Sequence, residues 1–170
     1  MKKQVLYLCC FLPLIAIGLF SCHIYSFSGA SLSTDIKNVS IKTFTNQASI
    51  VVPSLSEKIT EKLKDKFLKE MNLKLVEDNG DLTFKGSVVD YRIAPSSISA
   101  NDQSKTTRLT ISVKVKFENI KEPKLNYETV FSSYMDFDSS KDLSQVENDL
   151  IEGITDILVQ DIFNKAVNNW

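Results

Sequence analysis

Hydrophobic and polar residues alternate along parts of this chain with the spacing that is typical of strands. Between residues 109 and 117 apolar side chains occupy every second position, and polar side chains fill the positions between them. This period of two predicts a strand with one buried and one solvated face. A similar alternation over residues 37–44 predicts a first strand near the start of the domain.

Two other segments repeat their apolar residues at helical spacing. The first stripe consists of Leu55, Ile59, Leu63, Phe67 and Met71, and the second of Val146, Leu150, Ile151, Ile154, Ile157, Leu158, Ile162 and Phe163. Ser54 precedes Glu57 by three residues, which is the spacing of a capping box. Ser144 and Glu147 repeat this spacing, so we expect the two helices to begin at these serines.

The remaining strands are predicted from turn residues and short apolar runs. Residues 73–77 and 82–92 flank the turn sequence Asp78-Asn79-Gly80-Asp81, so we expect them to pair as a hairpin. A polar loop over residues 94–105 precedes the alternating strand, and residues 125–135 form a further strand. The predicted fold is α+β in the order β-α-β-β-β-β-α, with a parallel crossover followed by antiparallel strands. It has a mixed four- to five-stranded sheet with two α-helices packed on one face.

The first 21 residues have the layout of an export signal. Two lysines precede an apolar run over residues 5–20, and Cys22 follows this run. Residues 19–22 resemble a lipobox, so we expect cleavage before Cys22 and attachment of an N-acyl diacylglycerol lipid to this residue. The run is shorter than the roughly 20 residues of a spanning helix and contains Pro13, which argues against a membrane-spanning anchor.

The predicted organisation is a signal peptide over residues 1–21, a lipidated tether over 22–35 and a single α+β domain over 36–170. The alternative is a secreted protein cut near Ser21, in which Cys22 would stay a free thiol, a liability in an oxidising compartment. Because the other two cysteines lie in the leader, the mature chain cannot form an internal disulfide. We therefore expect packing to hold the fold together.

Composition and charge exclude several classes of function. The chain has 20 Lys and Arg against 21 Asp and Glu, a net charge of -1, whereas nucleic-acid-binding proteins are usually basic. The single histidine, His23, lies in the predicted tether, where neither a metal site nor a catalytic triad can be held rigidly. The sequence also has no Gly-rich phosphate loop. We therefore expect no enzymatic activity, no metal and no cofactor apart from the lipid.

Charged residues near the polar loop are candidates for binding. The only arginines of the chain, Arg92 and Arg108, bracket this loop, and Lys105 lies between them. Guanidinium groups bind phosphate bidentately, so the three residues are candidates to contact a phosphorylated lipid. The alternative is ordinary solvated surface charge. Asp136 and Asp138 weakly resemble a calcium loop, but turn formation accounts for both.

Four segments carry a family resemblance: Cys22–Gly29, Asn79–Gly86, Arg108–Phe117 and Asp161–Trp170. Together they are similar to the LptE family of lipopolysaccharide-assembly lipoproteins, in its Bacteroidetes-type branch. The resemblance implies two helices on a mixed sheet and an outer-membrane lipoprotein on the periplasmic side. It implies that the protein sits in an LptD-type β-barrel and assists the delivery of lipopolysaccharide, so its partners are the barrel, this lipid and the membrane.

Two other functions stay open at this point. The first is a stand-alone, periplasm-facing lipoprotein that binds a glycan or a peptide, which would have a concave apolar pocket and no barrel partner. The second is a hydrolase, which would show turnover that depends on a Ser or an Asp. For the barrel function, a compact domain tethered by lipid at one end can occupy the lumen, with its polar sheet face and loops against the polar wall.

Overall fold

The computed structural model describes residues 33, 35–97 and 106–168. Within these residues the chain forms two long helices, one short 3-10 helix and a single sheet. The elements are β1 (Asn38–Ile41), β2 (Thr45–Asn46), α2 (Pro53–Met71), β3 (Lys74–Leu75), β4 (Leu82–Ser97), β5 (Thr106–Asn119), the 3-10 helix η1 (Pro123–Leu125), β6 (Tyr127–Asp138) and α3 (Leu143–Asn168). No helix in this part of the chain is long and apolar enough to cross a membrane.

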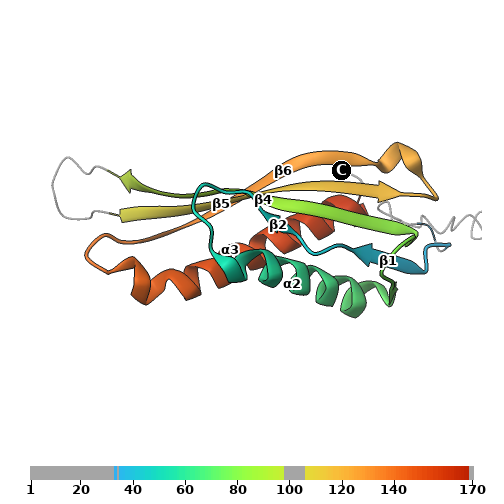
Figure 1. The fold of residues 1–170 in the computed structure, drawn as a ribbon, viewed down its shortest axis with the longest axis horizontal. Coiled ribbons are helices and arrows are strands. Elements are labelled where there is room, and N and C mark those ends of the chain that lie inside the picture. Colours follow the sequence, from blue (N-terminus) through green and yellow to red (C-terminus); the bar gives the residue numbers. More distant parts are fainter. Residues whose placement is uncertain (1–32, 34, 98–105, 169–170) are drawn as a thin grey trace, which may run out of the picture.

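The sheet is mixed (Figure 1). Its strand order is β3-β1-β4-β5-β6, and β2 pairs with β4 farther along the same edge that β1 occupies. β1 runs parallel to β3 and to β4, whereas β4, β5 and β6 are antiparallel neighbours. The α+β class and the parallel crossover through α2 are therefore confirmed. The sheet has six strands, more than the predicted four or five, because the two-residue β2 also pairs with β4.

The predicted hairpin between residues 73–77 and 82–92 is wrong. β1 lies between β3 and β4, so both strands pair with β1 and run parallel to each other. Residues of the expected turn instead contact β1. The Asp81 carboxylate accepts backbone hydrogen bonds from Lys37 at 2.8 Å and Asn38 at 3.1 Å, which fixes the start of β1 beside β4.

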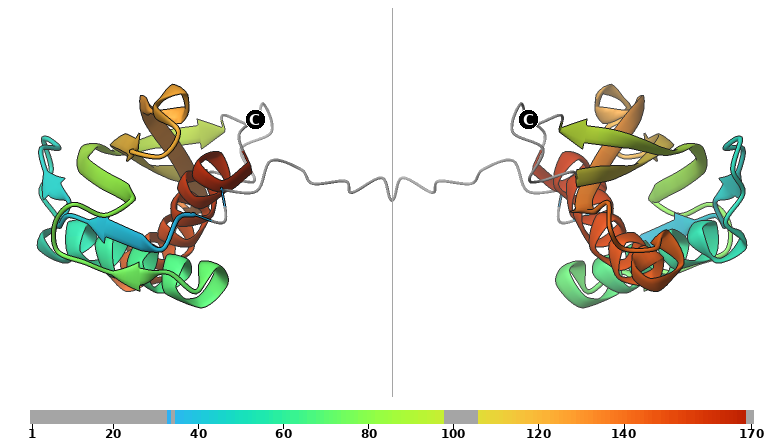
Figure 2. Two further views of the ribbon diagram at one scale, coloured as in Figure 1. Left: turned by 90° about the vertical axis from the view of Figure 1, so that its right-hand side faces the viewer. Right: turned by 90° about the vertical axis from the view of Figure 1, so that its left-hand side faces the viewer.

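Both helices pack on one face of the sheet, as predicted (Figure 2). The stripe on α2 is fully buried as far as Phe67. The ring of Phe67 lies 4.9 Å from that of Phe84 on β4 and 4.9 Å from that of Phe163 on α3. Phe84 in turn lies 4.8 Å from Phe117 on β5. These four rings connect both helices to the centre of the sheet.

The predicted N-caps Ser54 and Ser144 are wrong. α2 has Val52 at its N-cap position, with no side-chain hydrogen bond, and Pro53 follows at the first helical position. Proline suits this position because its fixed φ matches the helix and its missing N–H would be unpaired there anyway. α3 begins after Asp142, whose carboxylate accepts a hydrogen bond from the Ser144 N–H at 3.2 Å.

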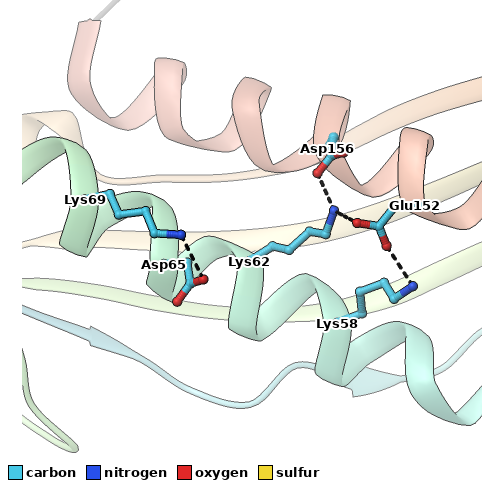
Figure 3. Close-up of polar contacts among 6 residues, drawn as sticks. All are labelled: Lys58, Lys62, Asp65, Lys69, Glu152 and Asp156. Atoms are coloured by element: carbon cyan, nitrogen blue, oxygen red, sulfur yellow. Dashed lines mark hydrogen bonds and ion pairs between the residues drawn. The ribbon is translucent and has the colours of Figure 1, made fainter.

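Ion pairs join the solvent-facing sides of the two helices (Figure 3). Glu152 on α3 contacts Lys58 of α2 at 2.9 Å and also contacts Lys62, which reaches Asp156 as well. Hydrogen bonds from Lys62 and Lys58 lower the pKa of Glu152 to about 2. Further pairs lie within α2: Glu61 with Lys64, Asp65 with Lys69 and Lys66 with Glu70.

The long strands extend beyond their predicted ends. β4 ends at Ser97 and β6 ends at Asp138, so the first part of the predicted polar loop belongs to the sheet. The Tyr91 hydroxyl donates a hydrogen bond to the Glu147 carboxylate at 2.6 Å, which ties this end of β4 to α3. Residues 98–105, the rest of the loop, lie outside the described residues.

Candidate functional site

The sheet face that points away from the helices is polar and is called the outer face here. On β5 the apolar residues at odd positions are buried toward the helices, so the even positions point to the outer face. Residues paired in register share a face, which extends this assignment to β4 and β6. Charged side chains of β5 and β6 form ion pairs on this face, and on β4 the Arg92 Nε lies 3.9 Å from an Asp90 carboxylate oxygen.

Arg108 on β5 is held by two residues of β6. Its Nε and Nη2 donate to the Asp136 carboxylate at 2.7 and 2.9 Å, and its guanidinium carbon lies 3.7 Å from the centre of the Tyr134 ring. The hydrogen bond from Arg108 lowers the pKa of Asp136, and the same contact raises the pKa of Arg108. Because a guanidinium has five N–H donors, Arg108 keeps donors for a further anion.

Arg92 lies next to this cluster. Arg92 pairs with Thr110 and Ala94 pairs with Arg108, so the two arginines are diagonal neighbours on the outer face. The Arg92 side chain is 66% exposed. The structure thus brings together two of the three candidate binding residues. The third, Lys105, lies outside the described residues.

A second cationic group on the outer face was missed by the sequence reasoning. Lys85 of β4 lies directly opposite Lys116 of β5, and Lys114 is two residues farther along β5. Lys116 contacts Glu118 at 2.8 Å and Lys114 contacts Glu128 at 2.5 Å, and these hydrogen bonds lower the pKa of both carboxyl groups. Lys85 has no ion-pair partner among the described residues. The alternation along β5 assigns Lys114 and Lys116 to the outer face. Only the register between β4 and β5 places Lys85 beside them.

The acidic residues near the end of β6 are bound by their neighbours. Asp136 pairs with Arg108, and the Asp138 carboxylate accepts a hydrogen bond from the Ser140 N–H at 2.8 Å. In residues 35–97 and 106–168 no three His, Cys, Asp or Glu side chains are grouped so that they could hold a metal ion. Cys22, the expected lipid attachment site, lies outside the described residues.

The sequence matches a family model over most of the predicted domain. The model is LptE, described as lipopolysaccharide-assembly, and it matches residues 36–166. The chain belongs to the LptE family. The resemblance inferred from four short segments is thereby confirmed. The matched range contains every strand of the LptE-family sheet, the whole of α2 and all but the last residues of α3.

Two solved structures share the fold of this LptE-family chain. The rare lipoprotein B from Shewanella oneidensis aligns with a TM-score of 0.51 and 9% identity, covering 76% of this chain and 90% of that one. The hypothetical protein CT253 from Chlamydia trachomatis aligns with a TM-score of 0.54 and 7% identity, covering 77% and 98%. At these identities the likeness establishes the fold alone. A comparison with curated proteins gives no match.

Proposed function

We propose that this LptE-family protein is a lipid-anchored subunit of an LptD-type β-barrel and assists lipopolysaccharide transport and assembly at the outer membrane. The family match over residues 36–166 is the observation that carries the proposal. The lipid is attached to Cys22, and the domain lies on the periplasmic side. The protein acts by binding and support, without catalysis.

The outer face supports a position inside a barrel. The lumen of an outer-membrane barrel is lined by polar side chains. Most charges on the outer face already have a partner within the sheet, as in the pairs Arg108–Asp136, Lys114–Glu128 and Lys116–Glu118. If this face lies against a polar wall, few charges are left without a partner. If it lay against acyl chains, the same charges would be buried in an apolar environment, which is costly.

We further propose that Arg92, Lys105 and Arg108 contact phosphate groups of lipopolysaccharide. Arg92 and Arg108 are diagonal neighbours on the outer face, and the Arg92 side chain is mostly exposed. Arginine binds phosphate through charge-assisted, bidentate hydrogen bonds. Tyr134 and Asp136 hold the Arg108 guanidinium in place, which reduces the entropy lost when an anion binds there.

Co-purification tests the barrel partner. Tagged protein extracted from outer membranes in mild detergent should bring down a large β-barrel protein. Mass spectrometry of the mature N-terminal peptide should show acyl groups on Cys22. Reproducible absence of a barrel contradicts the assembly role, and a soluble glycan or peptide in its place supports the stand-alone alternative. An unmodified Cys22 contradicts the anchor.

A pair of double variants tests the lipid contact. We expect Arg92→Ala with Arg108→Ala to weaken binding of purified lipopolysaccharide without lowering the melting temperature, because Arg92 is mostly exposed and the half-buried Arg108 forms only a surface ion pair. Lys114→Ala with Lys116→Ala removes the same charge elsewhere on the outer face and should leave binding nearly unchanged. Unchanged binding in the arginine variant rules out this site. Equal losses in both variants indicate general charge attraction instead.

A further inference from the structure

The lysines of the second cationic group border a hollow on the outer face, called the lysine hollow here. It has a volume of about 270 Å³. The side chains that line it are those of Thr45, Gln47, Lys85, Ser87, Lys114 and Lys116. They supply three ammonium groups, two hydroxyl groups and one amide, and none of them is a carboxylate. The hollow is therefore rich in hydrogen-bond donors.

The strand register brings these side chains together from three strands. Thr45 of β2 pairs with Ser87 of β4, and Ser87 pairs with Lys114 of β5, so these three residues form one row. Lys85 and Lys116 form the next row. Paired residues share a face of a sheet, so all five side chains lie on the outer face. Residues far apart in the sequence thus build one site.

Ser87 is the buried member of the lining. It is only 8% exposed, and its hydroxyl forms no hydrogen bond with any residue of 35–97 or 106–168. Ser112 on β5 is similarly buried, at 9% exposed, but donates a hydrogen bond to Ser132 at 3.0 Å. Buried hydroxyl groups usually have a partner, because an unpaired one is costly. A ligand in the hollow that accepts hydrogen bonds provides this partner.

The positive charge of the hollow exceeds the negative charge that surrounds it. Glu118 pairs with Lys116 and Glu128 pairs with Lys114, whereas Lys85 has no ion-pair partner in the part of the chain that the structure describes. Three lysines against two glutamates leave one positive charge in excess. Each paired ammonium group also keeps donors, because it has three N–H bonds. The hollow therefore attracts an anion.

The position of Lys85 directly opposite Lys116 also favours a bound anion. Like charges in this position destabilise a sheet, and an anion between the two ammonium groups replaces their repulsion with attraction. Phosphate suits the donors best. It has several strong acceptor oxygens, whereas a carboxylate has two, and lysine is a common phosphate ligand. Ser87 and Thr45 add hydroxyl donors beside the lysines.

The size and the place of the hollow favour a small ligand over lipopolysaccharide. Its volume is just below the roughly 300–1,000 Å³ of pockets for drug-sized ligands. Lys85 precedes Arg92 by seven positions on β4, a distance of roughly 23 Å along the strand, so a phosphate group at the arginines cannot also fill the hollow. We propose that the lysine hollow binds the phosphate group of a small soluble ligand, as inorganic phosphate or as a phosphate monoester.

An NMR titration tests the site. Inorganic phosphate is added, at constant ionic strength, to the full-length protein in non-ionic detergent micelles. The signals of the Ser87 backbone amide and the Lys85 ammonium group should shift and saturate. Glucose 6-phosphate should shift the same signals and glucose should not, and the lower of the two phosphate Kd values separates free from esterified phosphate. Shifts confined to other residues, or equal shifts with chloride, overturn the proposal.

Ser87→Ala is the decisive variant, because it removes one donor and leaves every charge in place. We expect the Kd for phosphate to rise about tenfold, as for the loss of a hydrogen bond to a charged group. Ser112→Ala is the matched control: it removes an equally buried hydroxyl on the same face but outside the hollow, and it should leave the Kd unchanged. An unchanged Kd in Ser87→Ala overturns the proposal.

Lys85→Gln tests the unpaired charge. It breaks no ion pair of the described residues, and the Kd for phosphate should rise about tenfold. Phosphate should also raise the melting temperature of wild type more than that of this variant. Lys124→Gln removes an exposed lysine that likewise has no ion-pair partner in residues 35–97 or 106–168 and should leave the Kd unchanged. Equal losses in the two variants indicate general charge attraction and overturn the proposal.

Lipopolysaccharide distinguishes the hollow from the arginine site. We expect it not to displace inorganic phosphate from the hollow. Lys114→Ala with Lys116→Ala should weaken phosphate binding while binding of lipopolysaccharide stays nearly unchanged. Displacement of phosphate by lipopolysaccharide overturns the assignment to a small soluble ligand, and phosphate binding that survives the lysine double variant overturns the site. Neither result bears on the barrel partner, so the proposed function is tested separately.

Discussion

The inner and outer faces of the sheet are formed by the same strands but hold their side chains in different ways. On the inner face the apolar residues of β5 are at most 1% exposed, and the rings of Phe67, Phe84 and Phe117 are in contact. On the outer face many of the alternate residues are charged, and six of them form three partly exposed ion pairs. Apolar burial contributes about 1.5–3 kcal/mol per large side chain, whereas exposed ion pairs contribute little. Stability therefore comes from the inner face, and the outer face is free for recognition.

The largest expected effect is the loss of an inner-face ring. Phe84 is fully buried between Phe67 and Phe117, so Phe84→Ala leaves a cavity that both helices and sheet surround. We expect the free energy of unfolding to fall by about 3–5 kcal/mol, measured by urea titration. Thr83→Ala, one residue away on the outer face, should change it by less than about 0.5 kcal/mol. Similar losses in the two variants would contradict the division between the faces.

Asp81 sharpens the comparison between the two faces. The alternation along β4 assigns it to the outer face, but it is only 9% exposed. Its carboxylate accepts hydrogen bonds from the backbone N–H groups of Lys37 and Asn38. Asp81→Ala leaves these two groups without an acceptor, and we expect a loss of about 1–3 kcal/mol in urea titration. Asp81→Asn keeps a carbonyl acceptor and should lose less. Equal stability of the alanine variant and wild type would show that these bonds do not hold β1 in place.

The two faces could be predicted from sequence because alternation is a local property. The period of two on β5 and the stripe on α2 depend only on which side of an element each residue occupies, and both are confirmed. Strand pairing is not local. Asp81 bonds to Lys37 and Asn38, which lie 44 and 43 positions away, and the insertion of β1 between β3 and β4 involves such contacts. A local turn signal at Asp78 to Asp81 therefore predicted the wrong neighbour.

The candidate site was predictable only where single residues stood out. Arg92 and Arg108 stand out in the sequence because they are its only arginines, and the strand register places them on one face. The position of Lys85 beside Lys116 depends on the register between β4 and β5, which shifts after Val88. No local sequence pattern predicts this shift.

A smaller effect is expected on the far side of the helices, where charge can be removed by pH. The pKa of Glu152 is about 2, below its ordinary value of 4.5. Its ion pairs therefore stabilise the fold above about pH 4.5, and this contribution is lost as the pH falls toward 2. Glu152→Gln removes the charge at every pH. We expect wild type to be the more stable protein at neutral pH, by a margin that shrinks on acidification in urea titrations. A margin that stays constant would contradict the ion-pair origin.

The smallest expected effect has the opposite sign and arises on the outer face. Lys85 lies directly opposite Lys116, and like charges in this position destabilise a sheet. Glu118 also lies near Lys85, but it is held by Lys116. Lys85→Gln should therefore raise the urea midpoint slightly at low salt, whereas Lys114→Gln breaks the pair with Glu128 and should not raise it.

Salt separates this charge effect from a change in packing. The screening length falls from about 10 Å at 0.1 M salt to about 3 Å at 1 M, so the gain from Lys85→Gln should disappear in high salt. A gain that persists at 1 M would come from the new side chain and not from relief of repulsion. A loss of stability at low salt would mean that attraction between Lys85 and Glu118 outweighs the repulsion from Lys116. The outer face would then be stabilised by its charges, and the contrast with the inner face would be one of degree.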